Sequence, residues 1–154
     1  MRHVSQDGLD LVKRFESFSA TIYICPAGKQ TIGYGHVIVD EAERERFAGG
    51  ISEEDAETLL ARDMETVERT VLRLIQVPLT DGQFDALASF AFNVGGGCLQ
   101  RSTLRSKVNR GEHAAVPAEF LKYVHGGGRV LPGLVRRRRA EGRLYSGAPR
   151  AATA

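Results

Sequence analysis

The chain has 154 residues, of which 42% are hydrophobic and 26% charged, and its formal net charge is +2. This length and apolar share fit one compact domain with a real core. Its two cysteines, Cys25 and Cys98, are too few for a disulfide scaffold and form no CxxC pair, so we expect synthesis in a reducing cytosol.

The N-terminal segment predicts an amphipathic helix. Ser5 can cap a helix in which Leu9, Val12 and Phe15 recur on one face, and Glu16 lies at its end. The segment contains no apolar run of about 7 to 15 residues, so we expect neither a secretory signal nor a membrane anchor. If the protein acts outside the cytoplasm, something else must therefore let it out.

Residues 18–39 predict a small antiparallel sheet. Aromatic and β-branched residues are frequent there, and Pro26-Ala27-Gly28 interrupts them as in a hairpin. Residues 40–50 predict a charged loop or a short helix. A long amphipathic helix is expected over about residues 52–76, opened by the capping-box-like Ser52-Glu53-Glu54-Asp55.

The second half of the chain predicts a helical bundle. Thr80 and Gln83 can cap a helix over 81–93 that is apolar nearly all round, so we expect it to be the central buried helix. Short helices are expected over about 102–109 and 113–123, and the latter must begin near His113 or later because proline is tolerated only in a first turn. A basic helix over about 134–145 and a disordered tail over 146–154 complete the chain.

This order of elements predicts an α+β fold in two lobes. A small antiparallel β lobe covers about residues 18–50, and a larger helical lobe covers residues 1–17 and 51–145. The long helix joins the two lobes. We expect one domain over residues 1–145.

Glu16 is a candidate general acid. It lies near Phe15 and Phe18 at the junction of the first helix and the sheet, where a carboxyl group can be poorly solvated. Glycoside hydrolysis needs such a carboxyl, kept protonated near neutral pH, and a second group at the anomeric carbon. Most lone glutamates at a helix end are solvated surface residues, so this assignment depends on the surrounding pattern.

Three segments in order carry a family resemblance. In the first, Cys25 follows Glu16 by nine residues, Thr31 follows Cys25 by six, and Thr31 opens the run Thr31-Ile32-Gly33-Tyr34-Gly35-His36. The others run from Leu79-Thr80 to Asn93-Val94-Gly95, and from Leu131-Pro132-Gly133-Leu134 into Arg-Arg-Arg-Ala-Glu. Together they resemble the phage-type lysozymes over about residues 5–145. The resemblance implies a lysozyme-like two-lobe fold. It also implies an endolysin that hydrolyses the β-1,4 bond between N-acetylmuramic acid and N-acetylglucosamine in bacterial peptidoglycan, causing host cell lysis. We then expect the protein to stay in the host cytoplasm until a separate pore protein releases it to the wall or periplasm.

The resemblance also implies a catalytic set of Glu16, Cys25 and Thr31, in which Thr31 orients a water molecule or the sugar. Better-known members carry Asp at the position of Cys25, and some relatives carry Cys. A thiolate, favoured by its surroundings against a reference pKa of about 8.5, could attack the anomeric carbon or act as a base. Inverting and retaining outcomes therefore both stay open.

Further site residues follow from the resemblance. Tyr34, Asn93 and Gly95 are expected to contact the glycan. One arginine of the basic helix, Arg136 or Arg137, is expected to pack beside Glu16 and the substrate.

The histidines are expected to be non-catalytic. The resemblance implies that His36 is structural and pairs with an acidic side chain, for which Asp81, Asp85 and a glutamate of the long helix are the candidates. The other three, His3, His113 and His125, are expected to be exposed. No His/Cys/Asp cluster has zinc-ligand spacing, so we expect no metal and no cofactor.

The basic C-terminal region predicts an anionic partner besides peptidoglycan. Residues 129–143 contain six arginines and one glutamate. Arg136 to Arg139 cannot all lie on one helix face, so at least two should be exposed, where they can meet the anionic cell surface. No nucleic-acid-binding motif is present, and we expect a monomer.

Three alternatives stay open at this stage. Cys25 with His36 could form a peptidoglycan amidase or peptidase. A lytic transglycosylase would cleave the same glycan without water. A non-enzymatic basic wall-binding module, driven by residues 136–143, would leave the pattern from Glu16 to Thr31 unexplained.

Overall fold

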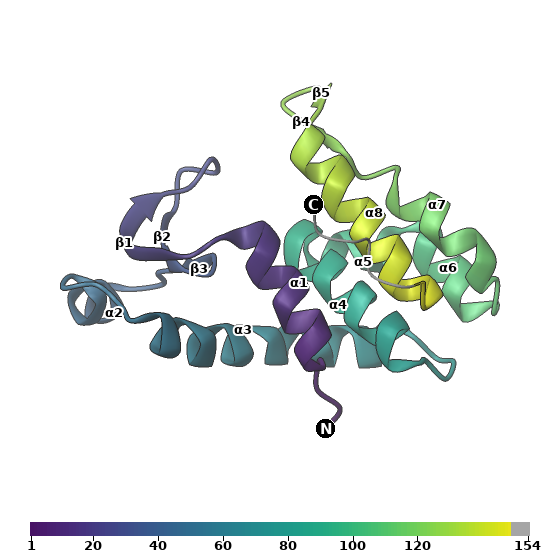
Figure 1. The fold of residues 1–154 in the computed structure, drawn as a ribbon, viewed down its shortest axis with the longest axis horizontal. Helices are drawn as coiled ribbons and strands as arrows, with labels where there is room; N and C mark the ends of the chain where they lie inside the picture. Colours follow the sequence, from purple (N-terminus) through teal and green to yellow (C-terminus); the bar gives the residue numbers. More distant parts are fainter. Residues whose placement is uncertain (149–154) are drawn as a thin grey trace.

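The computed structural model describes residues 1–148 and has the expected two-lobe α+β architecture (Figure 1). The first half of the chain contains helix α1 (Gln6–Glu16), strands β1 (Ser19–Ile24), β2 (Gln30–Gly33) and β3 (His36–Val37), and helices α2 (Glu41–Phe47) and α3 (Glu53–Leu74). The second half contains α4 (Asp81–Val94), α5 (Gly96–Arg101), α6 (Thr103–Asn109), the 3-10 helix η1 (His113–Ala115), α7 (Val116–Phe120), β4 (His125–Gly126), β5 (Arg129–Val130) and α8 (Pro132–Ser146). Helix α3 runs from beneath the sheet to beneath the helical bundle and so joins the two lobes (Figure 1).

The small lobe is an antiparallel sheet in the order β1-β2-β3. Its hairpin turn lies where the sequence predicts it, because the Cys25 N–H donates to the Lys29 carbonyl at 2.9 Å and the Gly28 N–H to the Cys25 carbonyl at 2.8 Å. Ile32 of β2 packs with Phe47 and Leu59, which gives this lobe a hydrophobic cluster of its own.

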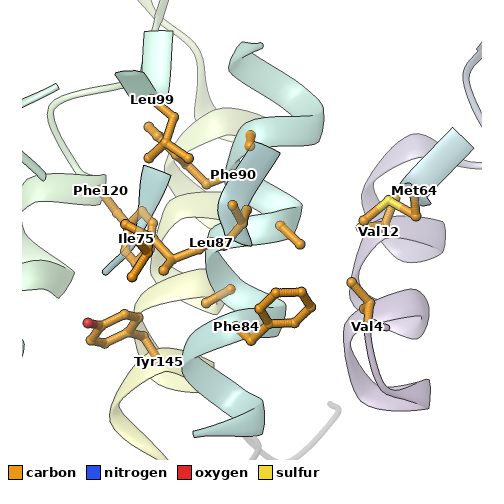
Figure 2. Close-up of a cluster of buried hydrophobic side chains, with 14 of the residues drawn as sticks. Val4, Val12, Met64, Ile75, Phe84, Leu87, Phe90, Leu99, Phe120 and Tyr145 are labelled. Carbon is orange, nitrogen blue, oxygen red and sulfur yellow. The ribbon is translucent and has the colours of Figure 1, made fainter. Parts of the chain in front are cut away.

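Helix α4 is the centre of the larger lobe, as its uniformly apolar sequence predicts. Thr80 and Gln83 form the expected reciprocal capping box at its start. Figure 2 shows Phe84, Leu87 and Phe90 of α4 surrounded by side chains of other elements, and all three are at most 1% exposed. Because α1, α3 and α8 all pack against α4, residues 84–91 of this helix are all buried.

Three local expectations are corrected. The sequence does not predict helix α5: Gly95 ends α4 with φ +93°, and α5 begins directly at Gly96. Helix α8 begins at Pro132, two residues before the expected start, because proline suits the first helical position. Ser146, expected in the disordered tail, is the last residue of α8, and residues 149–154 of that tail lie outside the described residues.

Over residues 1–148, no helix combines the length and the apolar character needed to cross a membrane. The 22 residues of α3 are amphipathic: the buried positions Ala56, Leu60, Met64 and Val71 recur on one face.

Candidate active site

An open cleft of about 820 Å³ lies between the two lobes. The end of α1, the β1–β2 hairpin, the β2–β3 turn, one face of α3 and the end of α4 all contribute to its lining. The three residues of the predicted catalytic set, Glu16, Cys25 and Thr31, all line this cleft.

Glu16 is the last residue of α1, and its carboxyl group is held from two sides. Nη1 of Arg137 donates to Oε1 at 2.8 Å, although 121 residues separate the two in sequence. Oε2 faces Gly35, and a Cβ atom added to Gly35 would lie only 2.7 Å from this oxygen. The side chain is 21% exposed, so one carboxyl oxygen is anchored while the group still reaches the cleft.

The turn after Glu16 is strained. Ser17 has φ +61° and is the only non-glycine residue with positive φ in the described part of the chain. A serine in this conformation stores backbone strain, and such residues cluster at functional sites. The turn ends α1 abruptly, which places Glu16 at the wall of the cleft.

Cys25 and Thr31 are brought together by the hairpin. Thr31 is 2% exposed, and its hydroxyl donates to the Lys29 carbonyl at 3.0 Å. The Lys29 N–H, and then the Thr31 hydroxyl, lower the pKa of the Cys25 thiol because both can donate to the thiolate. The Thr31 hydroxyl has one proton, so it serves either the Lys29 carbonyl or the Cys25 sulfur at a given moment.

His36 lies at the cleft but is held by two carboxylates. Its Nδ1 is 2.7 Å from Oδ2 of Asp63, and its Nε2 pairs with Oε1 of Glu43. Asp63 first, and then Glu43, raise the pKa of His36. Both ring nitrogens are thus engaged, so the imidazole is not free to activate Cys25.

The expected partners of His36 are wrong. Asp81 is exposed and pairs with Arg2, and buried Asp85 accepts from the N–H and the hydroxyl of Ser5. The long helix does supply a partner, but it is an aspartate, Asp63, and not a glutamate. Sequence alone could not choose because α3 carries seven acidic residues, and the docking of β3 decides which of them meets His36.

Two of the other three histidines have partners. His3 is exposed as expected, and its Nδ1 lies 3.1 Å from Glu68. His113 is half-buried, and its Nδ1 lies 2.6 Å from the hydroxyl of Tyr145, so it is not an exposed bystander. His125 is exposed. Within residues 1–148, no group of three or more His, Cys, Asp or Glu side chains could hold a metal ion.

Tyr34 is a buried residue of the turn between β2 and β3. It is 5% exposed and is not part of the cleft lining. Its ring packs on Phe18 at 5.6 Å between centroids, and its hydroxyl donates to Glu53 at 2.8 Å. The cleft lining therefore does not support the expected glycan contact, which stays a prediction. Tyr34 joins the sheet to the start of α3.

The four consecutive arginines of α8 divide into two pairs. Arg136 and Arg139 are exposed, which meets the expectation of at least two exposed side chains. Arg137 and Arg138 are 3% and 1% exposed, so Arg138 is not part of a solvated basic face. Arg137 is the arginine beside Glu16, and neither it nor Arg136 lines the cleft, so a direct glycan contact of these two is not supported.

Asn93 and Gly95 do line the cleft, at the end of α4. Oδ1 of Asn93 accepts from Nη2 of Arg138, and Nη1 of Arg138 donates to Glu141 at 2.5 Å. The sequence reading missed Arg138 and Glu141. Their spacing of three residues on a basic helix was the available signal.

Comparison with known proteins agrees with this geometry. A sequence model of the family described as phage lysozyme matches residues 13–141. The chain is 39% identical to the endolysin of Acyrthosiphon pisum secondary endosymbiont phage 1 over 150 residues, which are 95% of this chain and 99% of that protein. It is 43% identical to the endolysin of Bacillus phage B103 over 93% of this chain and 54% of that protein, so it spans about half the length of that relative. The solved muramidase domain of SpmX from Asticaccaulis excentricus matches it with a TM-score of 0.82 and 33% identity, over 94% of this chain and 98% of that chain.

Proposed function

Because the chain belongs to the phage lysozyme family, we propose that it cleaves the β-1,4 bond between N-acetylmuramic acid and N-acetylglucosamine. The protein is a peptidoglycan-hydrolysing endolysin and a lysozyme-type glycoside hydrolase. The particular bond and the residues that cleave it are our proposal. Its main support is that Glu16, Cys25 and Thr31, which come from separate elements, line one cleft.

Glu16 is the proposed general acid that protonates the leaving glycosidic oxygen. Its Oε1 is anchored by Arg137, so the carboxyl group has a defined orientation in the cleft. Substrate would cover the remaining exposed part of this side chain and reduce its solvation. The reaction needs this carboxyl group in its protonated form.

Cys25 is the proposed second group at the anomeric carbon. Its lowered pKa increases the fraction of thiolate, which can attack the anomeric carbon or remove a proton from water. The buried Thr31 hydroxyl beside it would hold the thiolate or that water molecule in place. The two pathways differ in the anomeric configuration of the first product, which NMR of a soluble substrate can read.

The deciding experiment is mass spectrometry of muropeptides after digestion of purified peptidoglycan. We expect new reducing N-acetylmuramic acid ends, and a folded Glu16→Gln variant should be slower by about two to four orders of magnitude. New free amines would indicate a peptidase or amidase, and anhydro-muramic ends a lytic transglycosylase. A Glu16→Gln variant with near-normal activity would contradict the proposed mechanism.

Two observations weigh against the alternatives. The peptidase needs His36 as the base for Cys25, but Asp63 and Glu43 occupy both of its ring nitrogens. A purely basic binding module would not require Glu16 and the Cys25–Thr31 pair to line one cleft. We keep a role for the basic surface as an addition to catalysis: Arg136 and Arg139 would attract the enzyme to the anionic cell surface.

We also propose that a separate pore-forming protein gives the enzyme access to the wall. The support is that the N-terminal residues are built into the domain, since Val4 is 7% exposed and Ser5 bonds to Asp85 of α4. Cells expressing the enzyme alone should remain intact until their membrane is permeabilised. Lysis without permeabilisation would contradict this route.

A further inference from the structure

A buried cluster of charges joins the candidate acid to a second residue of the same cleft lining, Asn93. It runs from Glu16 to Arg137, Glu141, Arg138 and finally Asn93. Glu16 and Asn93, the two ends of this chain of contacts, line the cleft, and the three residues between them are at most 3% exposed. Nothing in the proposed mechanism accounts for the central residue, Glu141.

Glu141 is fully buried and contacts both arginines. Its Oε1 accepts from Nη1 of Arg138 at 2.5 Å. Its Oε2 accepts from the Ser89 hydroxyl at 2.6 Å and lies 3.4 Å from Nε of Arg137. An unpaired charge is very costly at 0% exposure, so the pairing of Glu141 with both arginines matters, and two carboxyl groups and two guanidinium groups alternate along the cluster.

Because Arg137 lies between two carboxyl groups, Glu141 affects how strongly Arg137 attracts Glu16. Arg137 has two carboxylate neighbours, Glu16 in the cleft and Glu141 in the core. The negative charge of Glu141 offsets part of the attraction that Arg137 exerts on the ionised form of Glu16. Without Glu141, Arg137 and Arg138 would both favour an ionised Glu16, which cannot donate a proton.

The same residue orients the amide of Asn93 through Arg138. A guanidinium group has only donors, so the Asn93 atom that faces Arg138 must be Oδ1. The Asn93 amide nitrogen, which carries two donors, is then turned away from Arg138. Since Asn93 lines the cleft, this leaves hydrogen-bond donors available to a bound glycan.

We propose that Glu141 is a positioning residue that keeps Glu16 protonatable through Arg137 and presents Asn93 to the glycan through Arg138. The proposal rests on the proposed role of Glu16 as the acid. It predicts changes of opposite sign for two neighbouring substitutions, which a merely structural role of the cluster does not.

The test measures kcat and KM against pH on a soluble peptidoglycan fragment. Glu141→Gln removes a negative charge, so the alkaline fall of kcat should move to lower pH by about one unit, and kcat near neutrality should fall about tenfold. Arg138→Met removes a positive charge, so the alkaline fall should move to higher pH. It should also raise KM several-fold because Asn93 loses its partner.

The other groups around Glu16 are the same in all these variants. They are Tyr23 of β1, whose pKa is raised first by burial and second by the charge of Glu16, together with Cys25, His36 and Asp63 of the cleft lining. Opposite shifts can therefore be assigned to the altered charge in the cluster.

Glu119→Gln is the matched control. Glu119 is 3% exposed on α7, which packs against α8, and its oxygens contact Lys107 at 2.7 Å and Lys122 at 2.8 Å. This variant should lose stability without moving the alkaline fall of kcat or changing KM. If Glu141→Gln does not fold, the sign of the Arg138→Met shift and its KM decide the test.

Two results separate the possible failures. Unshifted or same-direction pH profiles in Glu141→Gln and Arg138→Met, with Glu16→Gln inactive, overturn the role of Glu141 alone. An active Glu16→Gln variant overturns the proposed function and this inference with it.

Discussion

Nδ1 of His36 lies 2.7 Å from Oδ2 of Asp63, so the small lobe is tied to the long helix by an ion pair at the cleft wall. Glu43 of α2 binds the other ring nitrogen, and the ring packs edge-on against Phe47 at 6.1 Å. One imidazole thereby joins β3, α2 and α3. The cleft depends on this junction because β3 and α3 both line it.

This pair should make stability depend on pH around neutrality. The folded-state pKa of His36 is raised, so its pairing stabilises the fold fully below the unfolded pKa of about 6.5 and is lost as pH rises through the folded-state pKa. Asp63→Asn should therefore cost about 2 kcal/mol near pH 5.5, and less at alkaline pH, in urea unfolding. Asp81→Asn is the control, because its exposed pair with Arg2 should contribute at most about 1 kcal/mol at either pH. A loss for Asp63→Asn that is equal at both pH values would contradict the assignment.

Substitutions of Cys25 should distinguish a catalytic thiol from a packing residue. In a Cys98→Ser background, Cys25→Asp should stay within about tenfold of the parent, and Cys25→Ala should lose about two orders of magnitude or more. Iodoacetamide should inactivate the parent and spare Cys25→Asp.

The thiol environment gives a second readout on Cys25. Thr31→Val removes a hydroxyl that lowers the pKa of Cys25, so alkylation at pH 7 should slow. Equal activity of the parent, Cys25→Asp and Cys25→Ala would show that Cys25 only fills space.

Gly35→Ala should impair catalysis more than its cost in stability explains. The added Cβ would lie 2.7 Å from Oε2 of Glu16 and would push the carboxyl group out of place. The matched control is Gly111→Ala. Gly111 has nearly the same φ as Gly35, +74° against +77°, but a Cβ atom added to Gly111 would meet no other atom within 4 Å. Both alanine variants should lose about 1–2 kcal/mol by thermal unfolding, but only Gly35→Ala should lose about tenfold or more in kcat. If kcat falls equally in both, the contact with Glu16 has no role.

The exposed arginines of α8 should make lysis of whole cells sensitive to salt. Long-range attraction to the cell surface is screened over about 8 Å in physiological salt, so lysis should weaken as salt rises. Arg136→Glu with Arg139→Glu should flatten this dependence, and cleavage of a small neutral oligosaccharide should change little. Arg69→Glu with Arg73→Glu on α3 alters the net charge equally on exposed positions of another helix. If that control flattens the salt curve as strongly, net charge and not the α8 surface is responsible.

Local patterns in the sequence were sufficient for most of the architecture. Thr80 with Gln83, and Ser52 before α3, predict helix starts because a cap depends on residues within one turn. The hairpin after Ile24 follows from its turn residues for the same reason. The set of Glu16, Cys25 and Thr31 came from the resemblance to phage-type lysozymes, and the fold brings these three residues to one cleft.

Contacts across the fold were decided only by the tertiary structure. Which arginine meets Glu16 depends on the rotation of α8 against α1, and four consecutive arginines are equivalent until that packing is known. Tertiary packing also decided that Asp63 is the partner of His36 and that Tyr34 is buried. It likewise decided that Glu141 pairs with two arginines. Local propensity acts over a few residues. The contacts of these side chains depend instead on how separate helices and strands dock, which no single segment encodes.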